Sequence, residues 1–150
     1  MNKVVVVDDQ PVIRVALRML LIEAGFQVVA EADNGLDAID RIKEQVPNFV
    51  ILDLDIPQID GLKVIQRISV MNLPISFLVF TAQDSHRTIM RCMRAGARGY
   101  VEKTEELDEL RKALRVLQSG YCFFPSWIND QLEPSSESAL INLLSQREMN

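Results

Sequence analysis

Polar side chains that could carry out phosphoryl chemistry follow four short segments that are typical of buried strands. They are Asp8 with Asp9, then Asp53, Thr81 and Lys103. Three carboxylates brought together repel one another and stay ionised together only around a cation, for which oxygen ligands favour Mg²⁺. A carboxylate beside Mg²⁺ can attack phosphorus and form an acyl phosphate. Lys103 would supply a cation, and Thr81 a hydroxyl, to the new phosphoryl oxygens.

Each of these positions also has a simpler interpretation, because polar residues commonly end strands and cap helices. That interpretation suffices for any one of them alone. Four strand ends that all suit one mechanism favour the chemical interpretation.

The elements expected to position these side chains alternate between strand and helix. The patterns predict strands over 4–7, 27–31, 49–52, 75–80 and 98–102, and helices over 11–24, 35–45, 62–70, 84–95 and from a cap at Thr104 to Ser119. Five such units with short connections predict an α/β fold of (βα)5 type, a doubly wound parallel five-stranded sheet with helices on both faces. Ligands bind beyond the carboxyl ends of the strands in such sheets, so the four polar positions should meet there.

Composition sets the class of protein. The chain has 150 residues, 48% of them hydrophobic, and a net charge of −5, which is typical of a globular domain and unlike a DNA-binding one. Two cysteines make no disulfide framework and fit a reducing compartment. Apolar stretches such as 19–22 are far too short to span a membrane, and no signal peptide opens the chain. We therefore expect a cytoplasmic protein with no membrane partner.

Together these motifs resemble the receiver domains of two-component response regulators. The resemblance covers residues 1–120 and rests on Asp8-Asp9, Leu52–Pro57, Asp60-Gly61, Thr81-Ala82, Gly96-Ala97, Gly99-Tyr100 and Lys103. It implies the flavodoxin-like, CheY-like receiver fold. It also implies a phosphoacceptor domain rather than an enzyme, whose partner is a sensor histidine kinase or a phosphotransfer domain.

The resemblance assigns a role to each site residue. Asp53 accepts the phosphoryl group, and Thr81 and Lys103 hold it. Mg²⁺ is held by Asp8, Asp9, Asp53 and the backbone carbonyl of Asp55.

Further residues would govern the switch and the lifetime of the phosphoryl group. Thr81 moves toward the phosphoryl oxygens, and Tyr100 turns inward into the space that Thr81 leaves. Asp55 and Gln83 occupy positions that tune dephosphorylation. Lys103 is followed by Thr104, where many receivers have proline, so this peptide bond is expected to be trans.

The C-terminal residues suggest an output domain. We expect a receiver over 1–120, a linker over 121–138, and over 139–150 the stub of a truncated helix-turn-helix domain. Leu144–Glu148 resembles the opening of a LuxR-type helix-turn-helix, which points to the NarL/FixJ class. Within it, Leu54–Pro57 and Gly120–Pro125 look most like the BvgA/EvgA type of transcriptional regulator. DNA would then be bound only through the missing domain.

A second apolar stripe on the first predicted helix indicates a covered surface. We expect a homodimer through this helix and the last one, formed by Val12, Val15, Met19, Ile22, Ala113 and Val116. The alternative is that Tyr121–Phe124 of the same chain covers the stripe.

Arginines at 87, 91, 94 and 98 form either a solvated face or a docking site for an acidic partner. His86 is assigned no role.

Two other classes of function stay open. Asp53-Leu54-Asp55 resembles the nucleophile motif of haloacid-dehalogenase-type phosphatases, although Pro57 departs from that motif, which also normally follows the first strand. A pseudo-receiver would only bind, and the complete set of acidic residues, threonine and lysine argues against it.

Overall fold

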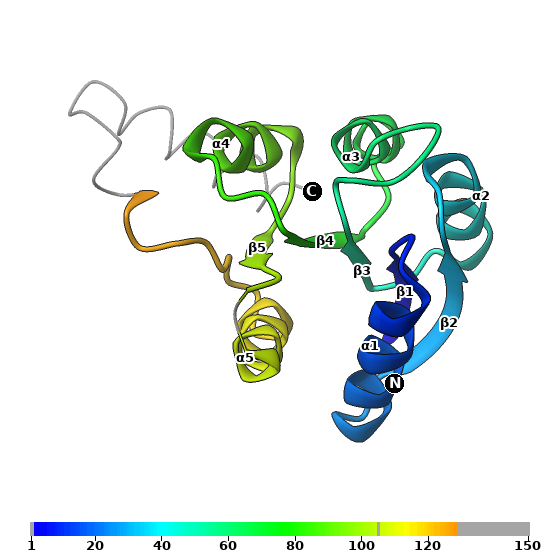
Figure 1. Cartoon of the computed structure of the whole chain (residues 1–150). Coiled ribbons are helices and arrows are strands. Elements are labelled where there is room, and N and C mark those ends of the chain that lie inside the picture. Colours follow the sequence, from blue (N-terminus) through cyan, green and yellow to red (C-terminus); the bar gives the residue numbers. More distant parts are fainter. Residues whose placement is uncertain (1, 105, 129–150) are drawn as a thin grey trace.

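Five strands alternate with five helices in the computed structural model, which describes residues 2–104 and 106–128 (Figure 1). The strands are β1 (Lys3–Val7), β2 (Gln27–Ala32), β3 (Phe49–Leu52), β4 (Ser76–Thr81) and β5 (Gly99–Glu102). The helices are α1 (Pro11–Glu23), α2 (Gly35–Gln45), α3 (Gly61–Ser69), α4 (His86–Ala95) and α5 (Leu107–Gln118). The predicted order of elements is confirmed.

The sheet is parallel throughout and has the strand order β2-β1-β3-β4-β5. Helices α1 and α5 cover one face, and α2, α3 and α4 cover the other (Figure 1). The central strands are buried because both faces are covered, which explains the continuous apolar runs at 4–7 and 49–52. The doubly wound (βα)5 fold is therefore confirmed.

The strand register brings the predicted polar positions to one edge of the sheet. Val7 pairs with Leu52, and the amide of Asp53 donates to the carbonyl of Val7 at 3.0 Å. On the other side, the amide of Lys103 donates to the carbonyl of Thr81 at 2.8 Å. Asp8, Asp53, Thr81 and Lys103 consequently stand at the carboxyl ends of four strands that end together.

Polar side chains cap the N-termini of α2, α3 and α4. Asn34 accepts from the Asp37 amide at the start of α2, and Asp60 caps α3 in the same way through Lys63. The predicted cap at Thr104 is wrong, since α5 begins at Leu107 after Glu106. The Thr104 hydroxyl instead donates to the Glu102 carboxylate at 3.3 Å. No cis peptide bond occurs in the described residues, which confirms the trans Lys103–Thr104 bond.

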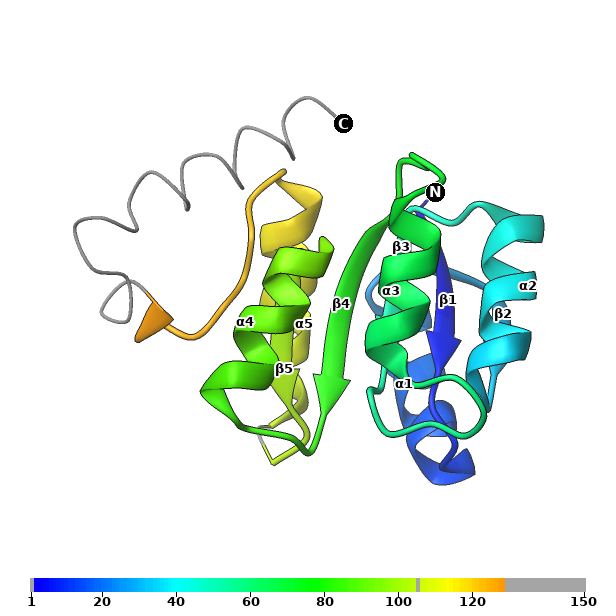
Figure 2. The ribbon, with the colours of Figure 1, turned by 90° about the horizontal axis from the view of Figure 1, so that it is seen from above.

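The segment after α5 packs back onto the domain, and we call Tyr121–Ile128 the strap. Phe123, which lies in the expected linker, forms one parallel bridge with Gly99 at the outer edge of β5. The strap runs outside α4 and α5 (Figure 2). The proposed output stub, together with the linker from residue 129 onward, lies outside the described residues.

The second stripe of α1, which was expected to be covered, is exposed in the single chain. Val12, Val15, Met19 and Ile22 are 45–77% exposed, so the strap does not cover them, and that alternative is wrong. Ala113 was expected on the dimer surface but is fully buried, because Leu110, Ala113, Leu114 and Leu117 form the core face of α5. Val116 is half-buried beside it. Of the helices in the described part of the chain, none has the length and apolar character of a membrane span.

Candidate functional site

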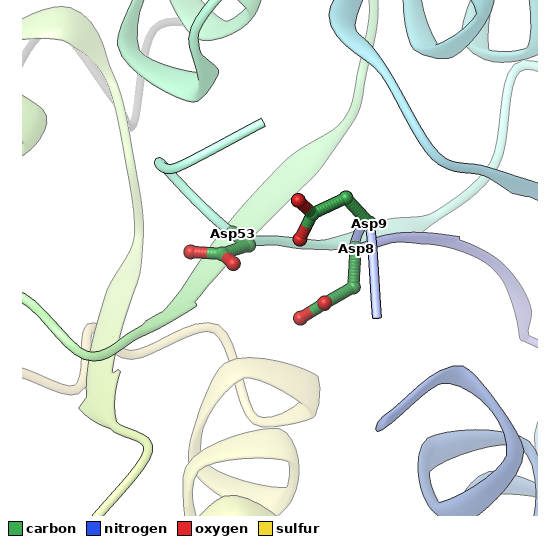
Figure 3. A group of neighbouring side chains, drawn as sticks. All are labelled: Asp8, Asp9 and Asp53. Carbon is green, nitrogen blue, oxygen red and sulfur yellow. The ribbon is translucent and has the colours of Figure 1, made fainter. Parts of the chain in front are cut away.

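Three carboxylates lie together where β1 and β3 end (Figure 3). One oxygen each from Asp8, Asp9 and Asp53 lies within 4.8 Å of the others. Asp8 and Asp53 are buried, with 1% and 4% of their surfaces exposed, and Asp9 is exposed. The carboxylate cluster predicted from the sequence is thus assembled by the fold.

Local backbone geometry fixes the two buried carboxylates. Asp8 Oδ1 accepts a hydrogen bond from the Gln10 amide at 2.9 Å, and Asp53 Oδ1 accepts one from the Asp55 amide at 3.1 Å. The loop after β3 is held close by Gly61, where a Cβ would lie 2.5 Å from the Asp53 carbonyl oxygen. Only glycine therefore fits at position 61 without shifting the backbone of Asp53.

Lys103 joins the cluster from the end of β5. Its Nζ lies 2.8 Å from Asp8 Oδ2 and 2.9 Å from Asp53 Oδ2. The same ammonium donates to Gln10 Oε1 at 3.2 Å. Asp8 and Asp53 thereby share one cation, and a single positive charge faces three carboxylates.

The electrostatics of the site reflect this imbalance. Burial raises the pKa of Asp8 above its ordinary value, although the nearby Lys103 and the Gln10 amide lower it in part. Burial would lower the pKa of Lys103, but its close contacts with Asp8 and Asp53 outweigh burial and raise that pKa. The lysine is therefore charged across the whole physiological range, and the carboxylates are under-neutralised.

Two buried oxygen atoms lack partners that their chemistry calls for. Thr81 Oγ1 is fully buried and has no hydrogen-bond partner among the described residues. Asp8 Oδ2 has the nearby ammonium, but no partner in hydrogen-bonding geometry. An oxygen-only donor set with a surplus of negative charge is suited to a hard divalent cation such as Mg²⁺. The free hydroxyl is suited to an additional oxygen acceptor at this edge.

A polar pair bridges the two loops next to the acidic cluster. Gln83 Nε2 donates to Asp55 Oδ1 at 2.7 Å, which links the loop after β3 to the loop after β4. Sequence reasoning selected both positions but not this contact between them. Because the Asp55 amide also donates to Asp53, this pair is connected to the acidic cluster through the loop after β3.

Tyr100 lies in an inward position. Its ring is 2% exposed, and its hydroxyl donates to the backbone carbonyl of Gln83 at 2.8 Å. Burial raises the pKa of this phenol. Tyr100 thus contacts the loop that follows Thr81.

Three contacts near the site were not predicted. Gln10 binds Lys103, and Arg14 donates to the Asp8 carbonyl at 2.7 Å. His86 stacks on Trp127 with ring centroids 3.8 Å apart. Only the position of Gln10 directly after the aspartate pair gave any signal in the sequence; the stack depends on tertiary packing.

Comparisons with known proteins agree with this geometry. A family model described as "Response regulator receiver domain" matches residues 4–115. The chain is 41% identical to the transcription regulator BvgA of Bordetella pertussis over 152 residues, which covers 99% of this chain and 73% of BvgA. It is 29% identical over 147 residues to the DNA-binding transcriptional activator EvgA of Escherichia coli, covering 97% and 72%.

A solved structure gives the same result for the fold. The isolated REC domain of RcsB from Salmonella enterica serovar Typhimurium, solved in the presence of the phosphomimetic BeF3−, matches with a TM-score of 0.79 and 26% identity. The match covers 88% of this chain and 99% of that domain.

Proposed function

Because the chain belongs to the receiver-domain family of two-component response regulators, we propose that Asp53 accepts a phosphoryl group in a Mg²⁺-dependent reaction. A receiver domain is a phosphoacceptor rather than a catalytic enzyme, and histidine kinases are the partners of such domains. The donor is a sensor histidine kinase or a phosphotransfer domain. The observation that carries the proposal is the buried Asp53 carboxylate beside Lys103 and the unpartnered Thr81 hydroxyl.

Each residue of the site has a separate role in the phosphoryl transfer. An oxygen of Asp53 attacks phosphorus and forms an acyl phosphate as the bond from phosphorus to the donor breaks. Lys103 and the Thr81 hydroxyl then bind phosphoryl oxygens. Asp8, Asp9, Asp53 and the Asp55 carbonyl would hold Mg²⁺, which supplies positive charge to the phosphoryl oxygens when bound.

The same contacts support a switch. A hydrogen bond from Thr81 to the phosphoryl group would draw its side chain toward Asp53. The Tyr100 ring is packed inside the domain, and its hydroxyl donates to the Gln83 carbonyl. Phosphorylation of Asp53 would therefore shift the loop between β4 and α4. We assign the control of dephosphorylation to Asp55 and Gln83, whose side chains are joined by a hydrogen bond of 2.7 Å.

The output is regulation of transcription. BvgA and EvgA are a transcription regulator and a DNA-binding transcriptional activator, and we extend this role to the present chain. We propose the division 1–120 for the receiver, 121–138 for the linker and 139–150 for the beginning of the output domain. DNA would be bound through that output domain, and the cytoplasm is the compartment in which such an output acts.

Phosphorylation is tested by intact-protein mass after incubation with acetyl phosphate and Mg²⁺. We expect a gain of one phosphoryl group in the wild type and none in Asp53→Asn or in EDTA. Hydrolysis of small phosphoesters without a stable gain would favour the phosphatase alternative. Neither gain nor hydrolysis would favour a binding module without chemistry.

We further propose a homodimer through α1 and α5. The exposed stripe Val12, Val15, Met19 and Ile22 lies in the same helical layer as α5, where Val116 is half-buried. Met19→Glu should shift light scattering of the phosphorylated protein from dimer to monomer. Val70→Glu is the matched control, because Val70 is 79% exposed on another helix layer. A wild type that stays monomeric when phosphorylated would contradict this interface.

A further inference from the structure

The strap is attached to the start of β5 by backbone hydrogen bonds on both sides of Gly99. The Tyr100 amide donates to the Phe123 carbonyl, and the Phe123 amide donates to the Arg98 carbonyl, each at 2.9 Å. The Arg98 side chain also donates to the carbonyl of Gly120 at 2.9 Å. The first half of the strap is therefore fixed to the strand that carries the proposed switch tyrosine.

The second half of the strap reaches α4. Ile128 is 6% exposed and packs into the core beneath α4, with Trp127 partly buried against the same cluster. The Trp127 indole stacks on the His86 imidazole with a centroid separation of 3.8 Å and an interplanar angle of 18°. His86 is the first residue of α4, directly after its N-cap Ser85.

One attachment is to the strand that carries Tyr100, and the other is to the helix that follows the loop contacted by Tyr100. The Tyr100 hydroxyl holds the Gln83 carbonyl, and His86 follows Gln83 by three residues. A shift of the loop after Thr81 would be passed along the chain to His86, while the backbone bonds of Phe123 hold the strap on β5. The contact between the two parts is the aromatic stack.

We propose that the His86–Trp127 stack is a latch that reports the state of Asp53 to the chain that follows the strap. This inference rests on the proposed function, since it requires a phosphoryl-dependent shift of the loop between β4 and α4. Phosphorylation changes the geometry of the stack and thereby the hold on Trp127, from which the chain continues to residue 129 and beyond. A stack of this kind can couple the two sites by about two- to tenfold in an equilibrium constant.

Trp127 allows a direct test, because it is the single tryptophan of the chain. Its emission is recorded before and after acetyl phosphate and Mg²⁺, with intact mass measured on the same samples. We expect the emission to change on phosphorylation in the wild type and to stay constant in Asp53→Asn. His86→Ala should lose most of the change, His86→Phe should restore part of it, and the neighbouring surface variant Arg87→Ala should behave as the wild type.

Coupling is reciprocal, so the same variants must alter the acceptor site. The midpoint of a BeF3− titration in the presence of Mg²⁺ should shift by about two- to tenfold in His86→Ala. A phosphoryl gain with unchanged Trp127 emission, or a His86→Ala variant identical to the wild type in both assays, would overturn the latch and leave the proposed function intact. Absence of the phosphoryl gain would overturn both.

Discussion

Replacing Lys103 with methionine removes the one cation shared by two buried carboxylates. Its Nζ lies 2.8 Å from Asp8 and 2.9 Å from Asp53. One such contact is worth about 6 kcal/mol at an effective dielectric constant of 20, and dehydration of the ions offsets much of it. Removing one partner of a buried ion pair costs about 3–5 kcal/mol.

In Lys103→Met, protonation of Asp8 would limit the loss of stability, because the buried carboxyl would then carry no charge. Holding this carboxyl protonated at pH 7 costs about 4.4 kcal/mol relative to its ordinary pKa of 3.8. We therefore expect Lys103→Met to lower the free energy of unfolding by about 3–4 kcal/mol at pH 7 in EDTA. Burial raises the pKa of Asp8, so its favourable contribution is complete below pH 3.8 and is lost as the pH rises through the folded-state value. The variant should thus approach the wild type near pH 4.

Urea unfolding at pH 7 and pH 4 measures both values. The matched control is Lys112→Met, because Lys112 is an exposed lysine 3.8 Å from Glu109 and should lose under about 1 kcal/mol. Saturating Mg²⁺ should restore part of the loss, about 2.7 kcal/mol at one hundred times the dissociation constant. A loss below about 1 kcal/mol at pH 7, or an equal loss at both pH values, would refute this account of the site's electrostatics.

Three further predictions concern single residues. Burial raises the pKa of Cys92 to about 12. At pH 8 a thiol reagent should therefore label half-buried Cys122 and reach buried Cys92 only on unfolding. Equal labelling rates for the two cysteines in the folded protein would contradict this. Gly61→Ala should destabilise the fold by about 1–3 kcal/mol in urea and slow phosphorylation of Asp53, because the new Cβ meets its carbonyl oxygen; unchanged rates would count against that contact. Tyr100→Phe should lower the free energy of unfolding by about 0.5–1.5 kcal/mol through loss of its hydroxyl bond, and an unchanged urea midpoint would argue against the inward ring.

The strand-end residues could be predicted from the sequence because a parallel sheet brings carboxyl ends together whatever the details of packing. Apolar runs located β1 and β3, and the residues after them had to meet at one edge. The shared contacts of Lys103 follow from the same rule. The chemical type of these residues and their positions at strand ends therefore predicted most of the acidic cluster.

Other features depend on competition that local sequence does not reveal. Thr104 is a good helix cap by type, but its hydroxyl bonds to Glu102 and the helix begins later. Ala113 was predicted to lie on the dimer surface, yet the rotation of α5 buries it and leaves Leu107 43% exposed. The bridge of Phe123 to Gly99 joins residues distant in the chain, so only tertiary packing determines it.

The most direct test of the central claim locates the phosphoryl group on the chain. Borohydride reduces an aspartyl phosphate to homoserine with loss of phosphate, and peptide sequencing by mass spectrometry then identifies the residue. After acetyl phosphate and Mg²⁺, we predict homoserine at position 53 and none at Asp8, Asp9 or Asp55. Homoserine at another of these carboxylates, with Asp53 unmodified, would contradict the account.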